Sequence, residues 1–339
     1  MRRSTIALLS VLVSLGGLVS TTLGQSENKP KEIIRAGIIG LDTSHAIAFT
    51  QIINDPKAEG VLAEVEVVAA YPNGVPDNPY SWNRVGQYTE QIRKMGVRIC
   101  ESIPELLGQV DVVLLETVDG RPHLEQARPV IAAGKRMFID KPMAASLADV
   151  LEIFRLAREA KVPVWSSSSL RFSSGFQAAR RGESFGKVLR CVAWSPMHLE
   201  EHHPDLFWYG VHGVETLFTI MGPGCEVVER PEQGKVIGYW KDGRVGIFEA
   251  RDGYGAEVEG TAGKGSAGKY EGYKPLVVEI CNFFKTGVVP VDEAETIEIF
   301  AFMEAADESK RRGGEKVSLA EVLEKARQFN EARRQSLTK

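Results

Sequence analysis

Short apolar runs alternate with helix-forming segments through the first half of the chain. The runs cover residues 33–39, 65–70, 97–100, 110–116, 136–139 and 162–165. Strands that are apolar almost throughout, each followed by a helix, are typical of a parallel sheet covered on both faces. The pattern therefore predicts an α/β domain of the Rossmann type over residues 32–168.

The segments between these runs contain clear helix signals. Ser102 and Glu105 form a capping box, Ser146 precedes another helix, and helices are predicted over 45–53 and 122–133. Residues 71–84 contain prolines, a glycine and asparagines, and are predicted to be a loop.

The pattern changes in the second half, where longer strands follow one another. They cover residues 187–196, 225–231, 235–251 and 254–263, and Lys241-Asp242-Gly243 marks a hairpin turn. Helices are predicted over 276–284, over 294–309 and from Ser318. Residues 169–335 are therefore predicted to form an α+β domain with a mostly antiparallel sheet. The glycine-rich run 253–272 is read as a hairpin loop, with a mobile flap as the alternative.

The first 24 residues have the composition of an export signal. Arg2 and Arg3 provide positive charge, residues 6–19 are apolar, and small residues follow at Thr22 and Gly24. Residues 6–19 are too few to span a bilayer, which needs about 20 apolar residues, so a cleavable signal over residues 1–24 is expected. The paired arginines allow either a twin-arginine or an ordinary secretory signal. The protein is expected to be periplasmic or secreted, with no membrane anchor after cleavage.

The composition of the 339-residue chain is that of an ordinary globular protein. It is 43% apolar and 25% charged, with a formal net charge of −4. The basic residues are scattered, which argues against a nucleic-acid partner. Four cysteines are widely spaced in apolar patterns, so buried free thiols are expected rather than a disulfide framework.

The stretch Arg35 to Ala46, "RAGIIGLDTSHA", has the outline of a strand, a glycine turn and a helix. A dinucleotide fingerprint needs three glycines there, but only Gly40 is present. Asp42 and His45 occupy the other two positions, and the aspartate brings negative charge towards a diphosphate. Asp42, Thr43 and Ser44 are also good helix-capping residues, so Asp42 has a purely structural alternative.

The stretch "VDVVLLETVDGRPHLEQARPVIAAGKRMFIDKPMAASLADV" (residues 110–150) carries a more specific signal. His123 lies six residues beyond Thr117. Asp140-Lys141-Pro142 occupies the position of a Glu-Lys-Pro turn in a known protein family. Arg171, "GVHGVETLFTIMG" (210–222) and "SKRRGGEKVSL" (309–319) continue the match. With this ordered set the chain resembles the Gfo/Idh/MocA oxidoreductase family, which includes glucose–fructose oxidoreductase and inositol dehydrogenase.

The resemblance implies a Rossmann domain followed by a domain with an open-faced antiparallel sheet. It also implies oxidation or reduction of a sugar, polyol or related alcohol with a tightly held NAD or NADP, and association into homo-oligomers through the exposed sheet. The residue after the second strand is not acidic, so the choice between NAD and NADP stays open. The cofactor site implied is Gly40, Asp42, Thr43, Ser44, His45, Thr117, Asp140, Lys141 and Pro142.

Two residues are the implied catalytic groups. Lys141 matches the family lysine beside the nicotinamide, where an ammonium stabilises the developing alkoxide. His212 matches the family histidine and is expected to act as acid or base. The aspartate that precedes this histidine by four residues in the family is Trp208 here.

The substrate is expected to contact a further group of side chains. These are His123, Arg171, Trp208 and Tyr209. The run Met197 to Glu215 holds four histidines and several glutamates, but Pro204 interrupts it, so no metal is assigned. Two other functions stay open. One is a non-redox carbohydrate-active enzyme, a lyase or hydrolase, with the turn rebuilt around Asp42 and His45. The other is a binding protein on the same fold without a cofactor.

Overall fold

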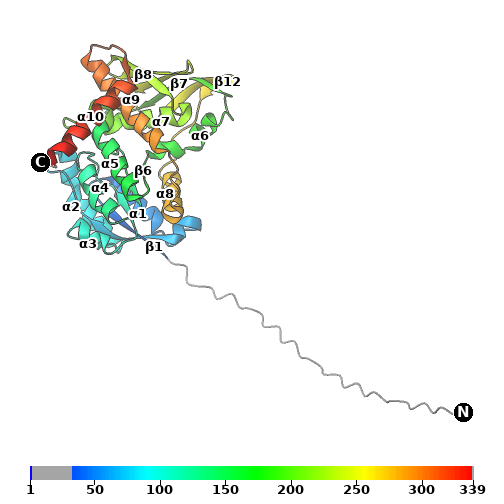
Figure 1. The fold of residues 1–339 in the computed structure, drawn as a ribbon. Helices are drawn as coiled ribbons and strands as arrows, with labels where there is room; N and C mark the ends of the chain where they lie inside the picture. Colours follow the sequence, from blue (N-terminus) through cyan, green and yellow to red (C-terminus); the bar gives the residue numbers. More distant parts are fainter. Residues whose placement is uncertain (2–32, 338–339) are drawn as a thin grey trace. The chain divides into compact units, whose positions relative to one another are not determined.

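The structure, a computed structural model, describes Met1 and residues 33–337 (Figure 1). The predicted export signal lies outside the described residues. The first six strands are β1 (Ile34–Ile39), β2 (Val65–Tyr71), β3 (Arg98–Ile99), β4 (Val112–Leu115), β5 (Met137–Ile139) and β6 (Val164–Ser166). The helices among and after them are α1 (Ser44–Ile53), η1 (Gly60–Glu64), α2 (Pro79–Lys94), α3 (Ile103–Leu107), α4 (His123–Ala132), α5 (Leu147–Ala160), η2 (Ser169–Phe172) and α6 (Ser174–Arg180).

The six strands form one parallel sheet with the order β3-β2-β1-β4-β5-β6. This confirms the predicted Rossmann-type sheet. The strand order reverses between β1 and β4, and in such sheets ligands bind at that point, beyond the carboxyl ends of the strands. The residues that follow β1, β4 and β5 therefore decide what this edge can hold.

Side-chain caps fix the starts of three of these helices. Thr43 accepts a hydrogen bond from the backbone N–H of His45 at the start of α1. Ser102 and Ser146 accept equivalent bonds at the starts of α3 and α5. Each cap satisfies an N–H group that the first helical turn leaves without a partner.

The predicted loop over residues 71–84 is wrong from Pro79 onward, because helix α2 begins there. The side chain of Asn78 accepts hydrogen bonds from the backbone N–H groups of Tyr80 and Ser81. Proline is well suited to the first helical turn, where its missing N–H costs nothing. The prolines and asparagines that suggested a loop include the start signal of this helix.

The second sheet has seven strands in the order β12-β11-β7-β10-β9-β8-β13, and all pairs are antiparallel except β7 with β10. This agrees with the mostly antiparallel sheet predicted for the second half. The strands are β7 (Val188–Ser195), β8 (Cys225–Glu232), β9 (Lys235–Trp240), β10 (Val245–Ala250), β11 (Gly255–Gly260), β12 (Gly263–Ser266) and β13 (Val317–Ser318). The remaining helices are η3 (Leu206–Gly210), α7 (Val211–Met221), α8 (Lys274–Thr286), α9 (Glu293–Arg311) and α10 (Leu319–Leu337).

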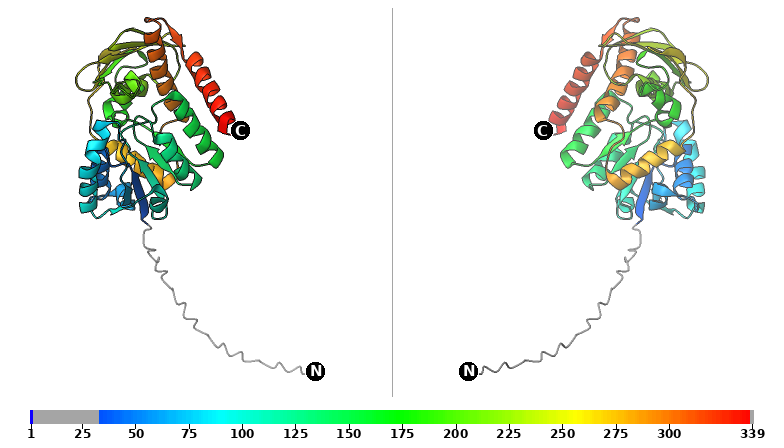
Figure 2. Two further views of the ribbon diagram at one scale, coloured as in Figure 1. Left: turned by 90° about the vertical axis from the view of Figure 1, so that its left-hand side faces the viewer. Right: turned by 90° about the vertical axis from the view of Figure 1, so that its right-hand side faces the viewer.

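Two helices from the second half of the chain pack against the first domain (Figure 2). Helix α8 places Phe283 and Phe284 in the same apolar cluster as Phe138 and Trp165 of the first sheet. The rings of Trp165 and Phe283 lie 6.0 Å apart. Helix α10 packs along α5, where the side chain of Asn330 donates to the carbonyl of Ala148. The first sheet is therefore covered in part by a helix from the second half of the chain.

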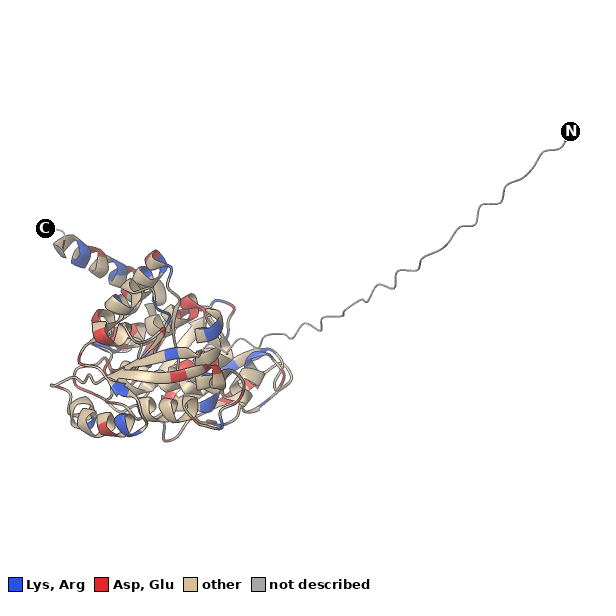
Figure 3. Cartoon of the chain, turned by 90° about the horizontal axis from the view of Figure 1, so that it is seen from below, with Lys and Arg blue, Asp and Glu red and all other residues tan. Residues whose placement is uncertain are grey.

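The thiols agree with the expectation from the sequence. All four cysteines are buried and free. Acidic and basic segments alternate along the ribbon in the view of Figure 3. Within the part of the chain that the structure describes, no helix combines the length and apolar character needed to cross a bilayer.

Candidate functional site

A cavity of about 100 Å³ lies at the carboxyl edge of the first sheet, where residues of the second domain close over it. It is lined by Thr43, Ser44, His45, Tyr80, Val118, Lys141, Ser169, Leu170, Tyr209, His212, Tyr254, Tyr270 and Tyr273. The cavity lies where Rossmann domains bind their ligands.

Lys141 and His212 come to this cavity from different domains. Lys141 follows strand β5 and is joined to Pro142 by a cis peptide bond, whereas His212 lies in the first turn of helix α7. Both side chains are largely buried. Burial, and then the charge of Lys141, hold the pKa of His212 well below its usual value. The structure therefore places Lys141 and the imidazole of His212 at the same cavity.

The imidazole of His212 is held in a fixed orientation. Its Nδ1 lies 2.7 Å from the hydroxyl oxygen of Ser168. The rings of Tyr209 and Tyr254 flank it, with centroids 5.4 Å and 5.7 Å from the imidazole. Because Nδ1 is engaged with Ser168, Nε2 is the nitrogen left for proton transfer.

Tyrosines form one wall of the cavity. The hydroxyls of Tyr254 and Tyr209 lie 3.3 Å apart, and the hydroxyl of Ser169 lies 3.3 Å from that of Tyr270. Burial raises the pKa of Tyr254, Tyr270 and Tyr273, so these phenols stay protonated and can donate hydrogen bonds. Sequence reasoning identified Tyr209 but missed the other three. Their signal was a set of aromatic residues within and just after the glycine-rich run.

The tight turn after β1 is intact. Gly40 has φ +95°, and a Cβ atom there would lie 2.3 Å from the backbone nitrogen of Thr117. Only glycine fits this combination of positive φ and close approach. Thr117 is itself buried, and its hydroxyl accepts a hydrogen bond from Gln126.

Asp42 takes the place of the second glycine and is fully buried. Its carboxylate accepts hydrogen bonds from the backbone N–H of Val118 (2.9 Å) and from the hydroxyl of Ser81 (2.6 Å). Burial raises its pKa to about 6, against these hydrogen bonds. The residue therefore links the turn to β4 and α2, and it brings a carboxylate to the point where a diphosphate approaches.

His45 takes the place of the third glycine. Its Nδ1 lies 2.6 Å from Oδ2 of Asp140, which precedes Lys141. The imidazole stacks on Phe49 and meets Tyr273 edge-on. Glu116, at the end of β4, lies fully buried beside this pair.

Three of the four predicted substrate residues, His123, Trp208 and Arg171, do not line the cavity. The ring nitrogens of His123 lie 2.7 Å and 3.1 Å from the carbonyl oxygens of Thr117 and Met143, in the fully buried interior. Trp208 is buried against Tyr80 and His203 and does not line the cavity. Tyr209, beside it, does line the cavity.

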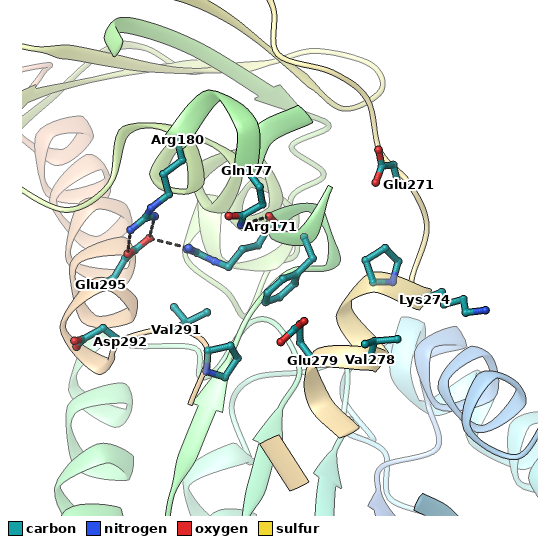
Figure 4. A pocket seen from close by; sticks show the side chains of 13 residues that line it. Arg171, Gln177, Arg180, Glu271, Lys274, Val278, Glu279, Val291, Asp292 and Glu295 are labelled. Atoms are coloured by element: carbon teal, nitrogen blue, oxygen red, sulfur yellow. Dashed lines mark hydrogen bonds and ion pairs between the residues drawn. The ribbon is translucent and has the colours of Figure 1, made fainter. Parts of the chain in front are cut away.

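Arg171 lies at a second hollow, of about 940 Å³, bounded by η2, α6, α8 and the start of α9 (Figure 4). Its guanidinium is buried and forms ion pairs with Glu215 and Glu295. Arg180 also bonds Glu295, so two arginines converge on one carboxylate. Arg171 is thus engaged in a buried ion-pair network away from Lys141.

The histidine-rich run does not form one cluster. His203 lies 2.6 Å from Glu200 and 3.2 Å from Asp119 through its two ring nitrogens. His202 pairs with the other oxygen of Glu200. His212 lies apart from these residues, at the cavity. The side chains gather in pairs with Glu200 rather than around one point.

Residues 34–168 match the family model described as "Oxidoreductase family, NAD-binding Rossmann fold" (GFO_IDH_MocA). A 1,5-anhydro-D-fructose reductase of Ensifer adhaerens is 34% identical over 31% of this chain and 32% of its own length. Inositol 2-dehydrogenase 3 of Saccharopolyspora erythraea is 25% identical over 49% of this chain and 52% of its own length. The chain thus spans about a third to a half of these curated relatives.

The fold extends further than the sequence similarity. The crystal structure of apo scyllo-inositol dehydrogenase from Lactobacillus casei superposes with a TM-score of 0.67 at 15% identity. That alignment covers 86% of this chain and 100% of the other. Residues 34–168 are thus similar to the NAD-binding domain of the Gfo/Idh/MocA oxidoreductases, and the likeness to the solved structure shows that the two-domain fold is shared.

Proposed function

We propose that this protein is an exported NAD(P)-dependent oxidoreductase that acts on an alcohol or ketone of a sugar, polyol or related carbohydrate. The observation that carries the proposal is the meeting of Lys141 and His212 at one small cavity. The named relatives support it, since two of them are a reductase of an anhydrosugar and a dehydrogenase of inositol.

The residues present fit the cofactor in part, with one residue that opposes it. Gly40 keeps the tight turn, and Thr43 and Ser44 line the cavity at the start of α1, where backbone N–H groups favour an anion. Lys141 would lie next to the nicotinamide. Asp42 is the residue that opposes the diphosphate, because its buried carboxylate carries like charge.

Lys141 and His212 have complementary roles in this proposal. NAD(P), when bound, accepts or supplies the hydride. The Lys141 ammonium stabilises the negative charge on the reacting oxygen. His212, neutral at pH 7 because its pKa is lowered, accepts the hydroxyl proton through Nε2 during oxidation and returns it during reduction.

The tyrosine wall suits a polyhydroxylated substrate. Tyr209, Tyr254 and Tyr270 present ring faces and phenol hydroxyls on one side of the cavity. Aromatic rings pack against the apolar face of a sugar ring, and the hydroxyls orient it by hydrogen bonding. These residues would select a ring that carries several hydroxyls.

The first experiment is release of bound nucleotide. The purified mature protein is denatured, and the supernatant is read by absorbance and mass, followed by titration of NAD(H) and NADP(H) and a screen of sugars and polyols. We expect bound nucleotide or binding on titration, and turnover of at least one polyol. Absence of nucleotide together with no affinity for either cofactor would contradict the proposal.

One observation favours a second function, a non-redox carbohydrate-active enzyme such as a lyase or hydrolase. Asp42, Glu116 and Asp140 surround the start of α1, and their charges interact closely enough to affect the pKa of Glu116. The charged carboxylates of Asp42 and Asp140 disfavour an anionic cofactor. Product release from the same substrates without any added or bound nucleotide would support this second function.

Export is the part of the proposal that rests on residues 1–24 alone. Expression of the full chain in a Gram-negative host should yield a mature protein that begins near Gln25 in the periplasmic or extracellular fraction. An unprocessed chain in the cytoplasm would contradict it. Replacement of both Arg2 and Arg3 by lysine separates the two routes, because twin-arginine export needs the arginine pair.

A further inference from the structure

Three residues from different parts of the first domain meet below the cavity. His45 lies in the first turn of α1, Glu116 follows β4, and Asp140 follows β5. One potential ligand atom from each lies within 4.8 Å of the others, and all three residues are buried. We propose that His45, Glu116 and Asp140 bind a divalent transition-metal ion such as Zn²⁺ or Mn²⁺.

The environment of Glu116 is the main evidence for a bound ligand. Both of its carboxylate oxygens are buried, and neither has a hydrogen-bond partner among the described residues. The rest of strand β4 is apolar and buried, so packing gives no reason for a carboxyl group at this position. A buried carboxylate without a partner is costly, and in proteins such groups are paired or coordinate metals.

The local charge also favours a cation. Asp42 and Asp140 both act on Glu116 as like charges, whereas Lys141 supplies opposing positive charge. His45 is engaged with Asp140 at 2.6 Å. A divalent ion placed between His45, Glu116 and Asp140 would offset two carboxylates at once.

The ligand set identifies the class of ion. One imidazole and two carboxylates suit zinc, manganese or iron better than calcium, which takes oxygen ligands. Bonds of about 2.0–2.2 Å place ligand atoms on opposite sides of an ion at most about 4.4 Å apart. The ligand atoms of the three residues lie within 4.8 Å of one another, so binding would draw the widest pair together and separate His45 Nδ1 from Asp140 Oδ2, which lie 2.6 Å apart without the ion.

The proposed site borders the cavity at His45. His45 belongs to the cluster, and it also lines the cavity with Thr43, Ser44 and Lys141. Phe49 and Tyr273 pack against the imidazole and limit its rotation. An ion held by three protein ligands keeps further coordination positions for water or a substrate oxygen.

A protonated Glu116 is the alternative to a bound cation. Burial and the neighbouring carboxylates raise the pKa of Glu116 well above its usual value, so a neutral carboxyl group is the competing state. The two explanations differ in one measurable way. A glutamine mimics the protonated acid, but it is a much weaker metal ligand than a carboxylate.

The test uses the mature chain without nucleotide or substrate, so its outcome does not depend on the proposed oxidoreductase activity. The metal content is measured after purification, the ions are removed with EDTA, and Mn²⁺ and Zn²⁺ are titrated by calorimetry and thermal unfolding. Mg²⁺ and Ca²⁺ serve as oxygen-preferring controls. We expect one Mn²⁺ or Zn²⁺ per chain and a rise in Tm on binding.

Glu116→Gln is the decisive variant, and Glu298→Gln is its matched control. Glu298 is a partly buried acid on α9 that accepts hydrogen bonds from the backbone N–H groups of Gly224 and Cys225. The side-chain oxygen of a glutamine can accept the same bonds. We expect Glu116→Gln to weaken metal binding by about 100-fold or more, and Glu298→Gln to leave it unchanged.

Three results would overturn the proposal. The first is wild-type protein that binds neither Mn²⁺ nor Zn²⁺ stoichiometrically. The second is Glu116→Gln that binds as tightly as wild type. The third is a higher Tm for Glu116→Gln than for wild type with no effect of metal on either protein, which would establish a protonated Glu116. The wild-type titration decides the question even if the variant fails to fold.

Discussion

The carboxylate of Asp42 accepts a 2.6 Å hydrogen bond from the hydroxyl of Ser81, which ties the turn after β1 to the first turn of α2. The same carboxylate accepts the N–H of Val118 beyond β4. This one side chain therefore joins both sides of the crevice in which Rossmann domains hold the diphosphate of a dinucleotide.

Asp42→Asn should keep both contacts and remove the charge, because an asparagine oxygen can accept from Val118 and its amide can donate to Ser81. We expect NAD(H) or NADP(H) to bind about tenfold more tightly, a change of about 1.4 kcal/mol. Calorimetric titration measures this. Ser81→Ala is the control, since it removes the hydrogen bond but not the charge. Weaker binding to Asp42→Asn would instead mean that the carboxylate makes a useful contact with the cofactor.

The same variant should change how stability depends on pH. The pKa of Asp42 is about 6 in the folded protein and 3.8 without the fold, so the folded state binds the proton more tightly. Above pH 6 the ionised carboxylate lowers stability, and this penalty fades as the pH falls from about 6 towards 4. The Tm advantage of Asp42→Asn should therefore shrink between pH 8 and pH 5. A constant difference would contradict the buried, ionised state.

Lys141→Ala should lower turnover by about 100-fold to 1000-fold while the protein stays folded, because the ammonium that stabilises the reacting oxygen is lost. Steady-state rates on a substrate found in the polyol screen measure the effect, and circular dichroism checks the fold. Lys264→Ala, at an exposed position on β12, is the control and should behave as wild type. A Lys141→Ala enzyme with wild-type rates would remove Lys141 from the mechanism.

His212→Ala should lower turnover by about 100-fold or more if the imidazole transfers the proton. In the wild-type enzyme, burial and the charge of Lys141 lower the pKa of His212. The rate of alcohol oxidation should therefore stay level as the pH falls through 6.5 and decline only at more acidic pH. A rate that halves near pH 6.5 would show an ordinary, exposed imidazole.

Arg171→Met should destabilise the protein by about 3–5 kcal/mol, because Glu215 and Glu295 would lose a buried cation. Urea unfolding measures the change in free energy. Arg181→Met is the matched control, since the ion pair of Arg181 with Glu183 is exposed and should contribute little. Equal stability of the two variants would show that Arg180 alone compensates Glu295.

Much of the first domain could be predicted from local pattern. The apolar run of β4 and the capping serines Ser102 and Ser146 each act over a few residues, so their structural effect is visible in the sequence. Helix α2 was missed because a loop-like composition hides the Asn78 cap and the proline that follows it. The composition of this segment favours a loop, but the Asn78 side-chain cap stabilises a helix from Pro79 onward.

The candidate site was harder to predict, because its members meet only through tertiary structure. Lys141 and His212 were found through resemblance, yet the contact of His45 with Asp140 spans 95 residues and has no local signature. Glu116 looked like the polar end of an apolar strand. Tyr254, Tyr270 and Tyr273 lay in or beside a run whose glycines suggested a plain loop.

The packing of Phe283 and Phe284 on the first sheet has a consequence for dissecting this protein. A fragment that ends near residue 168 would leave the face of Phe138 and Trp165 uncovered, since helix α8 lies more than a hundred residues later. Such a fragment should aggregate rather than fold. We therefore expect the first domain and the rest of the chain to fold and unfold together as one cooperative unit.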